Sequence, residues 1–137
     1  MKVIFLDIDG VLNHAGSAWL DPANLANLAR ITKATGCTVV LISSWRTEMH
    51  SARMIMFADM LNARGVTISG ITPSLNDRNA EIIDYLNRHN DISKFVVIDD
   101  ENHYRGSKIR KNVFLTIYTE GLTTDIADKI IRVLAEK

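Results

Sequence analysis

The chain has 137 residues, of which 47% are apolar and 23% are charged, a balance that predicts one compact domain and excludes a disordered chain, a collagen-like repeat or a disulfide-rich scaffold. Lys and Arg together number 16, as do Asp and Glu, so net charge gives no general attraction to nucleic acid or an anionic membrane. With a single cysteine, Cys37, and with no signal peptide or membrane-spanning apolar run, we expect a cytoplasmic protein.

Short apolar segments rich in β-branched residues alternate with longer segments whose apolar residues recur at helical spacing. The first segment, VIFLDI, is typical of a strand that is buried on both faces. Asp21 and Pro22 suit an N-cap and a first helical residue, and Gly36 suits a helix end. In chain order, we predict a strand at 3–8, a helix from Asp21 to Gly36, a strand at 38–42, a helix at 47–64, a strand at 66–68, a helix at 77–88, strands at 95–98 and 113–117, and a helix at 124–135.

This alternation of strands and helices predicts βαβ units with right-handed crossovers. The expected fold class is therefore α/β: a doubly wound, three-layer, Rossmann-like fold around a five-stranded parallel sheet. No linker, internal repeat or low-complexity segment divides the chain, so we expect residues 1–137 to form a single domain.

Three of the predicted strands end in pairs of polar residues. In open parallel sheets, ligands bind outside the carboxyl ends of the strands, so these pairs are expected to meet at one edge of the sheet. Polar residues often do no more than cap a strand, but three such endings, two of them acidic, favour a binding site. The pairs are Asp7 and Asp9, Ser43 and Ser44, and Asp99 and Asp100.

Four carboxylates at one edge would repel one another unless a cation neutralised them, and hard oxygen ligands favour Mg²⁺. The four histidines show no paired-ligand spacing, and Cys37 lacks a Cys-x-x-Cys partner, which argues against zinc. The glycine-rich dinucleotide signature and the Walker loop are also absent from the sequence. The predicted cofactor is therefore Mg²⁺.

Three segments resemble motifs of the haloacid dehalogenase (HAD) superfamily, in the order that the superfamily requires. FLDIDGVLN resembles motif I, LISSWR resembles motif II, and VVIDDE resembles the two-aspartate form of motif IV. Arg78 is the best candidate for the motif III cation. With Arg78-x-x-Glu81-Ile82 and Gly121-Leu122-Thr123, these segments resemble the small HAD domains of nucleic-acid repair proteins over almost the whole chain. The resemblance implies a HAD-like fold.

The resemblance also implies catalytic roles for these residues. Asp7 would be the nucleophile that forms an aspartyl-phosphate, and Asp9 would be the general acid and then the general base. Ser43 would donate a hydrogen bond to a phosphoryl oxygen, with Ser44 as the alternative donor, and Arg78 would stabilise the transition state. Mg²⁺ would be held by Asp7, by Asp99, by the backbone carbonyl of Asp9, and by Asp100 through water.

The motif III cation and the role of Trp45 each have an alternative assignment. If Arg78 only pairs with Glu81 on the helix surface, Lys94 or Lys108 would have to supply the cation. Trp45, which opens the helix after motif II, is as often a packing residue as a substrate contact. The predicted substrate-binding residues are Gly10, Ser44, Arg46 and Lys108.

In this superfamily, an Asp at the second position of motif I indicates a phosphatase or phosphomutase, so we expect a Mg²⁺-dependent phosphomonoesterase. The intervals where HAD enzymes insert a cap domain, 13–20 and 45–78, are too short for a separate fold, so we expect an open site without a cap. An open site admits a polymer end, which favours nucleotides or terminal phosphates of nucleic acid as substrates. A basic cluster after motif IV would assist binding; it comprises Arg105, Lys108, Arg110 and Lys111.

Three other classes of function compete with this one. A broad phosphatase of small metabolites could take its cap from a partner subunit. A phosphoryl-accepting switch similar to response-regulator receiver domains would place its acceptor Asp after the third strand, where this chain has no acid. A silent binding domain would be expected to lack a motif acid, and none is missing. We expect no membrane association and no obligate protein partner.

Overall fold

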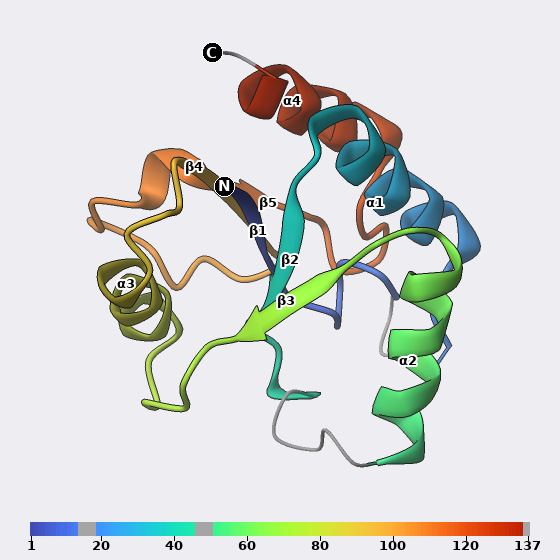
Figure 1. Ribbon diagram of the computed structural model, residues 1–137, viewed down its shortest axis with the longest axis horizontal. Coiled ribbons are helices and arrows are strands. Elements are labelled where there is room, and N and C mark those ends of the chain that lie inside the picture. Colours follow the sequence, from blue (N-terminus) through green and yellow to red (C-terminus); the bar gives the residue numbers. More distant parts are fainter. Residues whose placement is uncertain (14–18, 46–50, 136–137) are drawn as a thin grey trace.

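The structure is a computed structural model that describes residues 1–13, 19–45 and 51–135. Within these ranges, five strands form one parallel sheet in the order β3-β2-β1-β4-β5, and helices cover both of its faces (Figure 1). This arrangement confirms the predicted three-layer, doubly wound α/β fold. In chain order the elements are β1 (Lys2–Leu6), α1 (Pro22–Thr35), β2 (Thr38–Leu41), α2 (Ala52–Ala63), β3 (Ile68–Ile71), α3 (Arg78–Arg88), β4 (Lys94–Asp99), the short 3₁₀ helix η2 (Arg110–Asn112), β5 (Val113–Leu115) and α4 (Thr124–Ala135).

The central strand, β1, is buried on both faces because helices pack on each side of the sheet. Ile4 and Leu6 belong to a core formed with α1, α2 and α4. Val3 and Phe5 belong to a second core, formed with α3 and the segment 104–113. Figure 1 shows α1, α2 and α4 on one side of the sheet and α3 on the other. The strand therefore delivers the residues that follow it to a rigid position.

Side-chain caps fix where two of the helices begin. The Asp21 carboxylate accepts hydrogen bonds from the backbone N–H groups of Ala23 and Asn24, and α1 ends at Gly36 with φ 73°, as the sequence predicts. The Asp77 carboxylate accepts from the N–H of Ala80, so α3 begins at Arg78. This cap places the arginine at the first helical position, beside the carboxyl ends of the strands.

The third strand is Ile68–Ile71, so the predicted strand at 66–68 was wrong in its bounds. Ser69-Gly70 resembles a turn in the sequence, yet Gly70 lies in this edge strand because Tyr85 of α3 packs against it. A Cβ at position 70 would collide with the Tyr85 hydroxyl. Val66, predicted to start the strand, is buried in the core before the strand begins.

Within the described residues, the second helix begins at Ala52. The Ser51 hydroxyl caps it by accepting from the N–H of Met54 at 3.2 Å. Residues 47–50 of the predicted helix at 47–64 lie outside the described residues. Between β2 and α3, the described residues contain α2 and β3, besides a 3₁₀ turn at Ser44 and Trp45.

In the part of the chain that the structure describes, no helix combines the length and the apolar character needed to cross a membrane.

Candidate functional site

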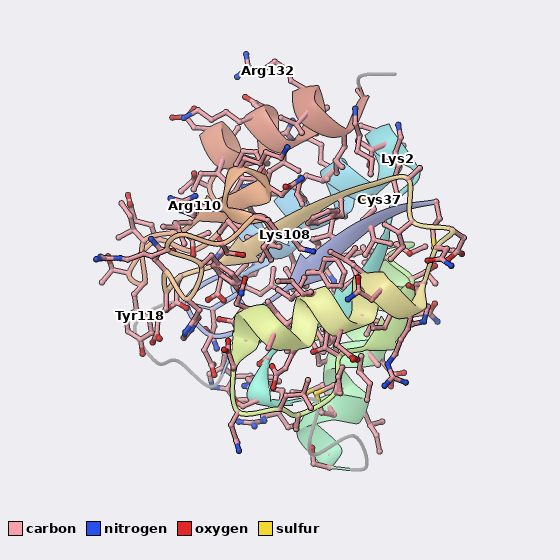
Figure 2. All side chains as sticks on the ribbon, turned by 90° about the vertical axis from the view of Figure 1, so that its left-hand side faces the viewer. Lys2, Cys37, Lys108, Arg110, Tyr118 and Arg132 are labelled. Carbon is pink, nitrogen blue, oxygen red and sulfur yellow. The ribbon has the colours of Figure 1, made fainter. Side chains whose placement is uncertain are left out.

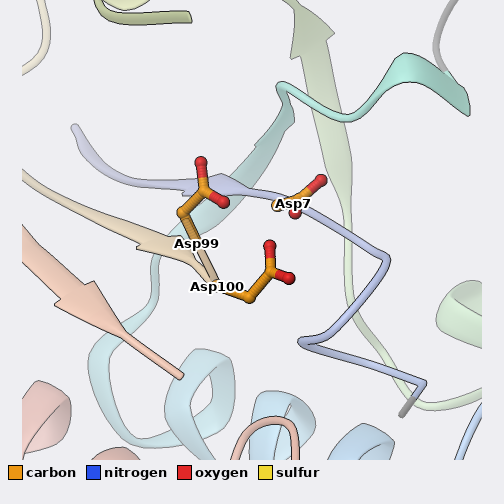
Figure 3. A group of neighbouring side chains, drawn as sticks. All are labelled: Asp7, Asp99 and Asp100. Atoms are coloured by element: carbon orange, nitrogen blue, oxygen red, sulfur yellow. The ribbon is translucent and has the colours of Figure 1, made fainter. Parts of the chain in front are cut away.

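Three carboxylates meet where β1 and β4 end (Figure 3). The two strands are neighbours in the sheet, and the Asp7 N–H donates to the carbonyl of Ile98, so Asp7 and Asp99 leave the sheet side by side. One oxygen of each of Asp7, Asp99 and Asp100 lies within 4.8 Å of the others. The strand ends predicted to share one edge therefore bring three acidic side chains together.

Two of the three carboxyl groups of this cluster are buried, and Asp100 is half-buried. Asp7 is 6% exposed and Asp99 is fully buried. Burial, and then the charge of Asp99, raise the pKa of Asp7 to about 8, although Arg78 opposes the shift. Burial also raises the pKa of Asp100. Three hard oxygen donors whose charges repel one another fit a divalent cation such as Mg²⁺, which would hold them ionised.

Arg78 points into the cluster. Its Nη1 lies 3.2 Å from Oδ2 of Asp99 and 3.6 Å from Oδ1 of Asp7. Burial of the guanidinium disfavours its charge, but Asp7 and Asp99 outweigh that cost, so the pKa of Arg78 is raised. The arginine therefore stays charged beside the carboxylates.

Glu81, the alternative partner of Arg78, lines the side pocket with it, and its negative charge adds to those of Asp7 and Asp99 in raising the pKa of Arg78. Glu81 is buried and accepts a hydrogen bond from the N–H of Leu75 at 2.7 Å. Lys94 begins β4, at the opposite edge of the sheet, and its Nζ donates to the carbonyl of Val133. The structure thus brings Arg78, and not Lys94, to the acidic cluster.

Asp9 lies apart from the three clustered carboxylates and is held by two donors. Its Oδ1 accepts from Nδ2 of Asn13 at 2.9 Å, and its Oδ2 accepts from Nε1 of Trp45 at 3.1 Å. The Oδ1 of Asn13 is in turn occupied by the N–H of Gly10, at 2.9 Å. The side chain of Asp9 is therefore oriented by its neighbours rather than by the cluster.

Gly10 makes the close approach between the motif I loop and β4 possible. It has φ 78°, and a Cβ there would collide with the Asp100 carboxylate. Its carbonyl accepts a 2.6 Å hydrogen bond from the Thr116 hydroxyl. The predicted strand at 113–117 ends earlier than expected, at Leu115, although the N–H of Thr116 still donates to the carbonyl of Asp99. Both backbone polar groups of Gly10 are engaged within the fold, and its predicted contact with substrate stays a prediction.

The two serines of motif II differ in their surroundings. Ser43 is 1% exposed, and its Oγ accepts from the N–H of Trp45 at 3.2 Å. Ser44 is exposed and lines the same depression as Asp7 and Arg78. Of the two predicted donors, Ser44 is thus the one that faces the acidic cluster. The assignment of the donor role stays a prediction.

Two adjoining depressions surround these residues. The smaller, which we call the acidic pocket, has a volume of about 240 Å³. The larger, the side pocket, has a volume of about 480 Å³ and extends from the acidic pocket past Asn76 and Asp77 at the start of α3. Ser44, Arg78 and His103 line both depressions. The remaining residues that line the acidic pocket are Asp7, Asp9, Asp99, Asp100, Glu101 and Tyr118.

Two of the predicted substrate-binding residues lie away from these depressions or outside the described residues. Arg46 is not among the described residues. Lys108 is exposed on the segment before η2, and Figure 2 shows it above Tyr118, together with Arg110. The guanidinium of Arg110 donates to the carbonyl of Val113. Neither Lys108 nor Arg110 lines the acidic pocket, and a role for this basic cluster stays a prediction.

Tyr104 is a residue of the site that the sequence did not suggest. It is fully buried, and its hydroxyl donates to Oδ2 of Asp99 at 2.8 Å. Oδ1 of Asp99 accepts from the N–H of Glu101. Burial, and then the negative charge of Asp99, raise the pKa of Tyr104, so the phenol remains a donor. The one available signal was its position five residues after a motif IV aspartate.

One of three comparisons with known proteins identifies a family for this chain. A family model described as the HAD domain in Swiss Army Knife RNA repair proteins matches residues 3–127. The search of curated proteins and the search of solved structures each found no match. The matched region contains β1 to β5, the acidic cluster, Arg78 and Tyr104. The chain belongs to the family of HAD domains found in Swiss Army Knife RNA repair proteins.

Proposed function

We propose that this domain is a Mg²⁺-dependent phosphomonoesterase that works through an aspartyl-phosphate on Asp7. The observation that carries the proposal is the convergence of three carboxylates and one arginine at the carboxyl edge of the sheet. A phosphoryl group needs both a nucleophile and positive charge around its oxygens, and this edge offers an acid, a cation-binding donor set and a guanidinium. Membership of a HAD family supports the same class of reaction.

In the first half-reaction, an oxygen of Asp7 would attack phosphorus as the bond from phosphorus to the leaving oxygen breaks. Asp9 would supply the proton that the leaving oxygen takes up. Mg²⁺ bound by Asp7, Asp99, the Asp9 carbonyl and, through water, Asp100 would neutralise the carboxylates and the phosphoryl oxygens. Arg78 would bind phosphoryl oxygens through its planar fork as negative charge develops.

In the second half-reaction, water would replace Asp7 on phosphorus. Asp9, now ionised, would take a proton from that water as the bond from phosphorus to the Asp7 oxygen breaks. Inorganic phosphate would leave, and Asp9 would again carry the proton that the next cycle requires. Ser44, or Ser43 if the loop rearranges, would donate to a phosphoryl oxygen in both halves.

Nucleotides or the terminal phosphates of nucleic acid are the proposed substrates. The description of the family supports this choice, because it names RNA repair proteins. The side pocket adds room beside the acidic pocket for a leaving group larger than a methyl or glyceryl group. The basic cluster at 105–111 would attract a polyanion from the outside. A broad phosphatase of small metabolites is the alternative, and it requires no preference for a polymer.

A phosphate-release assay tests the activity. The purified chain is offered 3′- and 5′-phosphorylated oligonucleotides, the matching mononucleotides and an aryl phosphate, each with Mg²⁺ and with excess chelator. We expect phosphate release with Mg²⁺ only, and a preference for oligonucleotides that shrinks as salt rises, because counterion release drives polyanion binding. Neutralising Lys108, Arg110 and Lys111 together should remove that preference. Release without Mg²⁺ would contradict the metal-dependent mechanism, and equal use of all substrates at low salt would leave the small-metabolite alternative.

A further inference from the structure

The indole of Trp45 makes a contact that packing alone does not require. The ring is 3% exposed, and its N–H donates to Oδ2 of Asp9 across two motifs that are 36 residues apart in the sequence. We propose that Trp45 is a positioning residue, which fixes the carboxyl group of Asp9 so that its proton passes to the leaving oxygen and returns from water. This inference rests on the proposed function, because it assigns Asp9 the role of acid and base.

The two groups that hold Asp9 are both donors. The indole of Trp45 can only donate, because it offers no acceptor atom. The amide of Asn13 directs its NH₂ group toward Asp9, because its oxygen already accepts from the N–H of Gly10. A proton on Asp9 therefore finds no acceptor in either neighbour. It is left for a group in the acidic pocket, which Asp9 also lines. The contacts thus select the direction of proton transfer as well as the orientation of the carboxyl group.

The indole itself is held by its surroundings. Phe57 of α2 packs against it edge to face, with ring centroids 5.9 Å apart and an angle of 73° between the rings. The guanidinium carbon of Arg53 lies 3.9 Å from the centre of the Trp45 ring system. The ring therefore packs against α2, and its N–H makes a separate contact with Asp9. Because neither Phe57 nor Arg53 lines the acidic pocket, they provide control variants outside the site.

A packing role and a positioning role make different predictions for Trp45→Phe. Phenylalanine keeps an aromatic ring beside Phe57 but removes the N–H that Asp9 accepts. Protonation of the leaving oxygen matters most when that oxygen is a poor leaving group. We therefore expect Trp45→Phe to lower kcat/KM by about 10- to 100-fold for an alkyl phosphate and by less than about threefold for 2,4-dinitrophenyl phosphate. Both substrates are compared at saturating Mg²⁺.

Phe57→Leu is the matched control, because it loosens the packing of the Trp45 ring without removing the N–H. A residue that only packs would cause equal losses for both phosphates, in Trp45→Phe as in Phe57→Leu. Equal losses in Trp45→Phe, or no loss at all, would therefore overturn the positioning role. If the wild-type protein releases phosphate from none of the substrates, the proposed function and this inference both fail. If the wild type is active and Trp45→Phe has the same leaving-group dependence as the wild type, this inference alone fails.

The contact can also be measured without catalysis. The chain has two tryptophans, so the ¹⁵N–¹H spectrum of the metal-free protein has at most two indole signals, and Trp45→Phe identifies one of them. Replacing the Asp9 carboxyl group with an amide changes the group that the Trp45 indole N–H contacts. Asp9→Asn should therefore move the Trp45 indole signal and leave that of Trp19 in place. An unmoved Trp45 signal would show that the indole does not bind Asp9 and would overturn the proposal.

Discussion

Asp7 and Asp9 are two positions apart in the sequence, but acidic groups surround Asp7 whereas hydrogen-bond donors surround Asp9. Asp7 faces Asp99 and Asp100, so its nearest neighbours on one side are other acids. Asp9 lies outside that cluster and accepts hydrogen bonds from Asn13 and Trp45. One residue type thus occupies two different places: a cluster of acids beside Arg78, and a place where the protein itself supplies two hydrogen-bond donors.

The difference has a simple geometric cause. Asp7 follows the last residue of β1, and its N–H continues the ladder to Ile98, so its position is set by the sheet. The chain then turns, with the N–H of Val11 donating to the carbonyl of Ile8 and Gly10 at a positive φ. The turn directs Asp9 toward the end of β2, where Trp45 lies. Environments that separate two carboxylates in this way are how one site obtains a nucleophile and an acid from the same side chain.

The largest expected effect is the loss of activity in Asp7→Asn, which distinguishes a nucleophile at position 7 from an acid at position 9. Asp7→Asn should lower phosphate release by at least about 10⁴-fold, because an amide cannot attack phosphorus. Asp7 lies beyond the end of β1, so the variant should keep the wild-type circular dichroism spectrum. The same assay on Asp9→Asn should show a smaller loss for a phosphate with a good leaving group. Turnover retained by a folded Asp7→Asn variant would contradict its assignment as nucleophile.

Loss of the cation should have the next largest effect on phosphate release. It should act through the acidic cluster that contains Asp7, and not through the surroundings of Asp9. Excess chelator, or Asp99→Ala, should each lower phosphate release by about 10³-fold, and added Mg²⁺ should restore only the chelated wild type. Mg²⁺ should also raise the melting temperature of the wild type and of Asp9→Asn, because it binds the folded state. A melting temperature that does not respond to Mg²⁺ in the wild type would argue against a metal site in the acidic cluster.

The edge of the sheet where the site lies could be predicted from the sequence, because strands that end in polar pairs obey a general rule of parallel sheets. The rule reaches only residues that adjoin a strand. Tyr104 does not adjoin a strand, and its place in the polar segment ENHYRGS gives no sign that its hydroxyl turns toward Asp99. The rule could not predict the contact between Trp45 and Asp9 either, because a sequence does not say where an indole N–H points.

The fold itself was predicted less well at its edge than at its centre. Continuous β-branched runs identify strands that are covered on both faces, and β1 is such a strand. The edge strand β3 contains Ser69 and Gly70, and only the packing of Tyr85 explains why a glycine is suitable there. Tertiary contacts, rather than local preference, therefore decide the bounds of the edge strand.

The raised pKa of Asp7 predicts how the metal-free protein responds to pH. Since the folded pKa of about 8 exceeds the ordinary 3.8, the folded state holds a proton that the unfolded state releases. Stability contributed by this group is therefore greatest at low pH and falls as pH rises through the window from about 4 to about 8. At about 1.4 kcal/mol for each unit of pKa, we expect the free energy of unfolding in chelator to fall across that window by up to about 6 kcal/mol.

Asp7→Asn is the control for this pH dependence, because it removes the titrating group and keeps its shape. Urea unfolding of the metal-free variant should show a flatter dependence on pH than the wild type. Asp9→Asn should keep the slope of the wild type, since it leaves the acidic cluster intact. A wild-type protein that becomes more stable between these pH values, or a slope unchanged by Asp7→Asn, would show that Asp7 is not the group responsible.

The smallest expected effect concerns Tyr104, which orients Asp99 from behind. Tyr104→Phe removes one hydrogen bond to Oδ2 and leaves the bonds from Arg78 and from the N–H of Glu101. Groups that orient a metal ligand typically change metal affinity by about tenfold or more. We therefore expect the Mg²⁺ concentration for half-maximal activity to rise by about tenfold, with near wild-type turnover at saturating Mg²⁺. Tyr85→Phe also removes a phenol hydroxyl, but beside β3, and should leave the Mg²⁺ dependence unchanged. Turnover that stays low at saturating Mg²⁺ would mean that Tyr104 supports the chemistry directly rather than by holding Asp99.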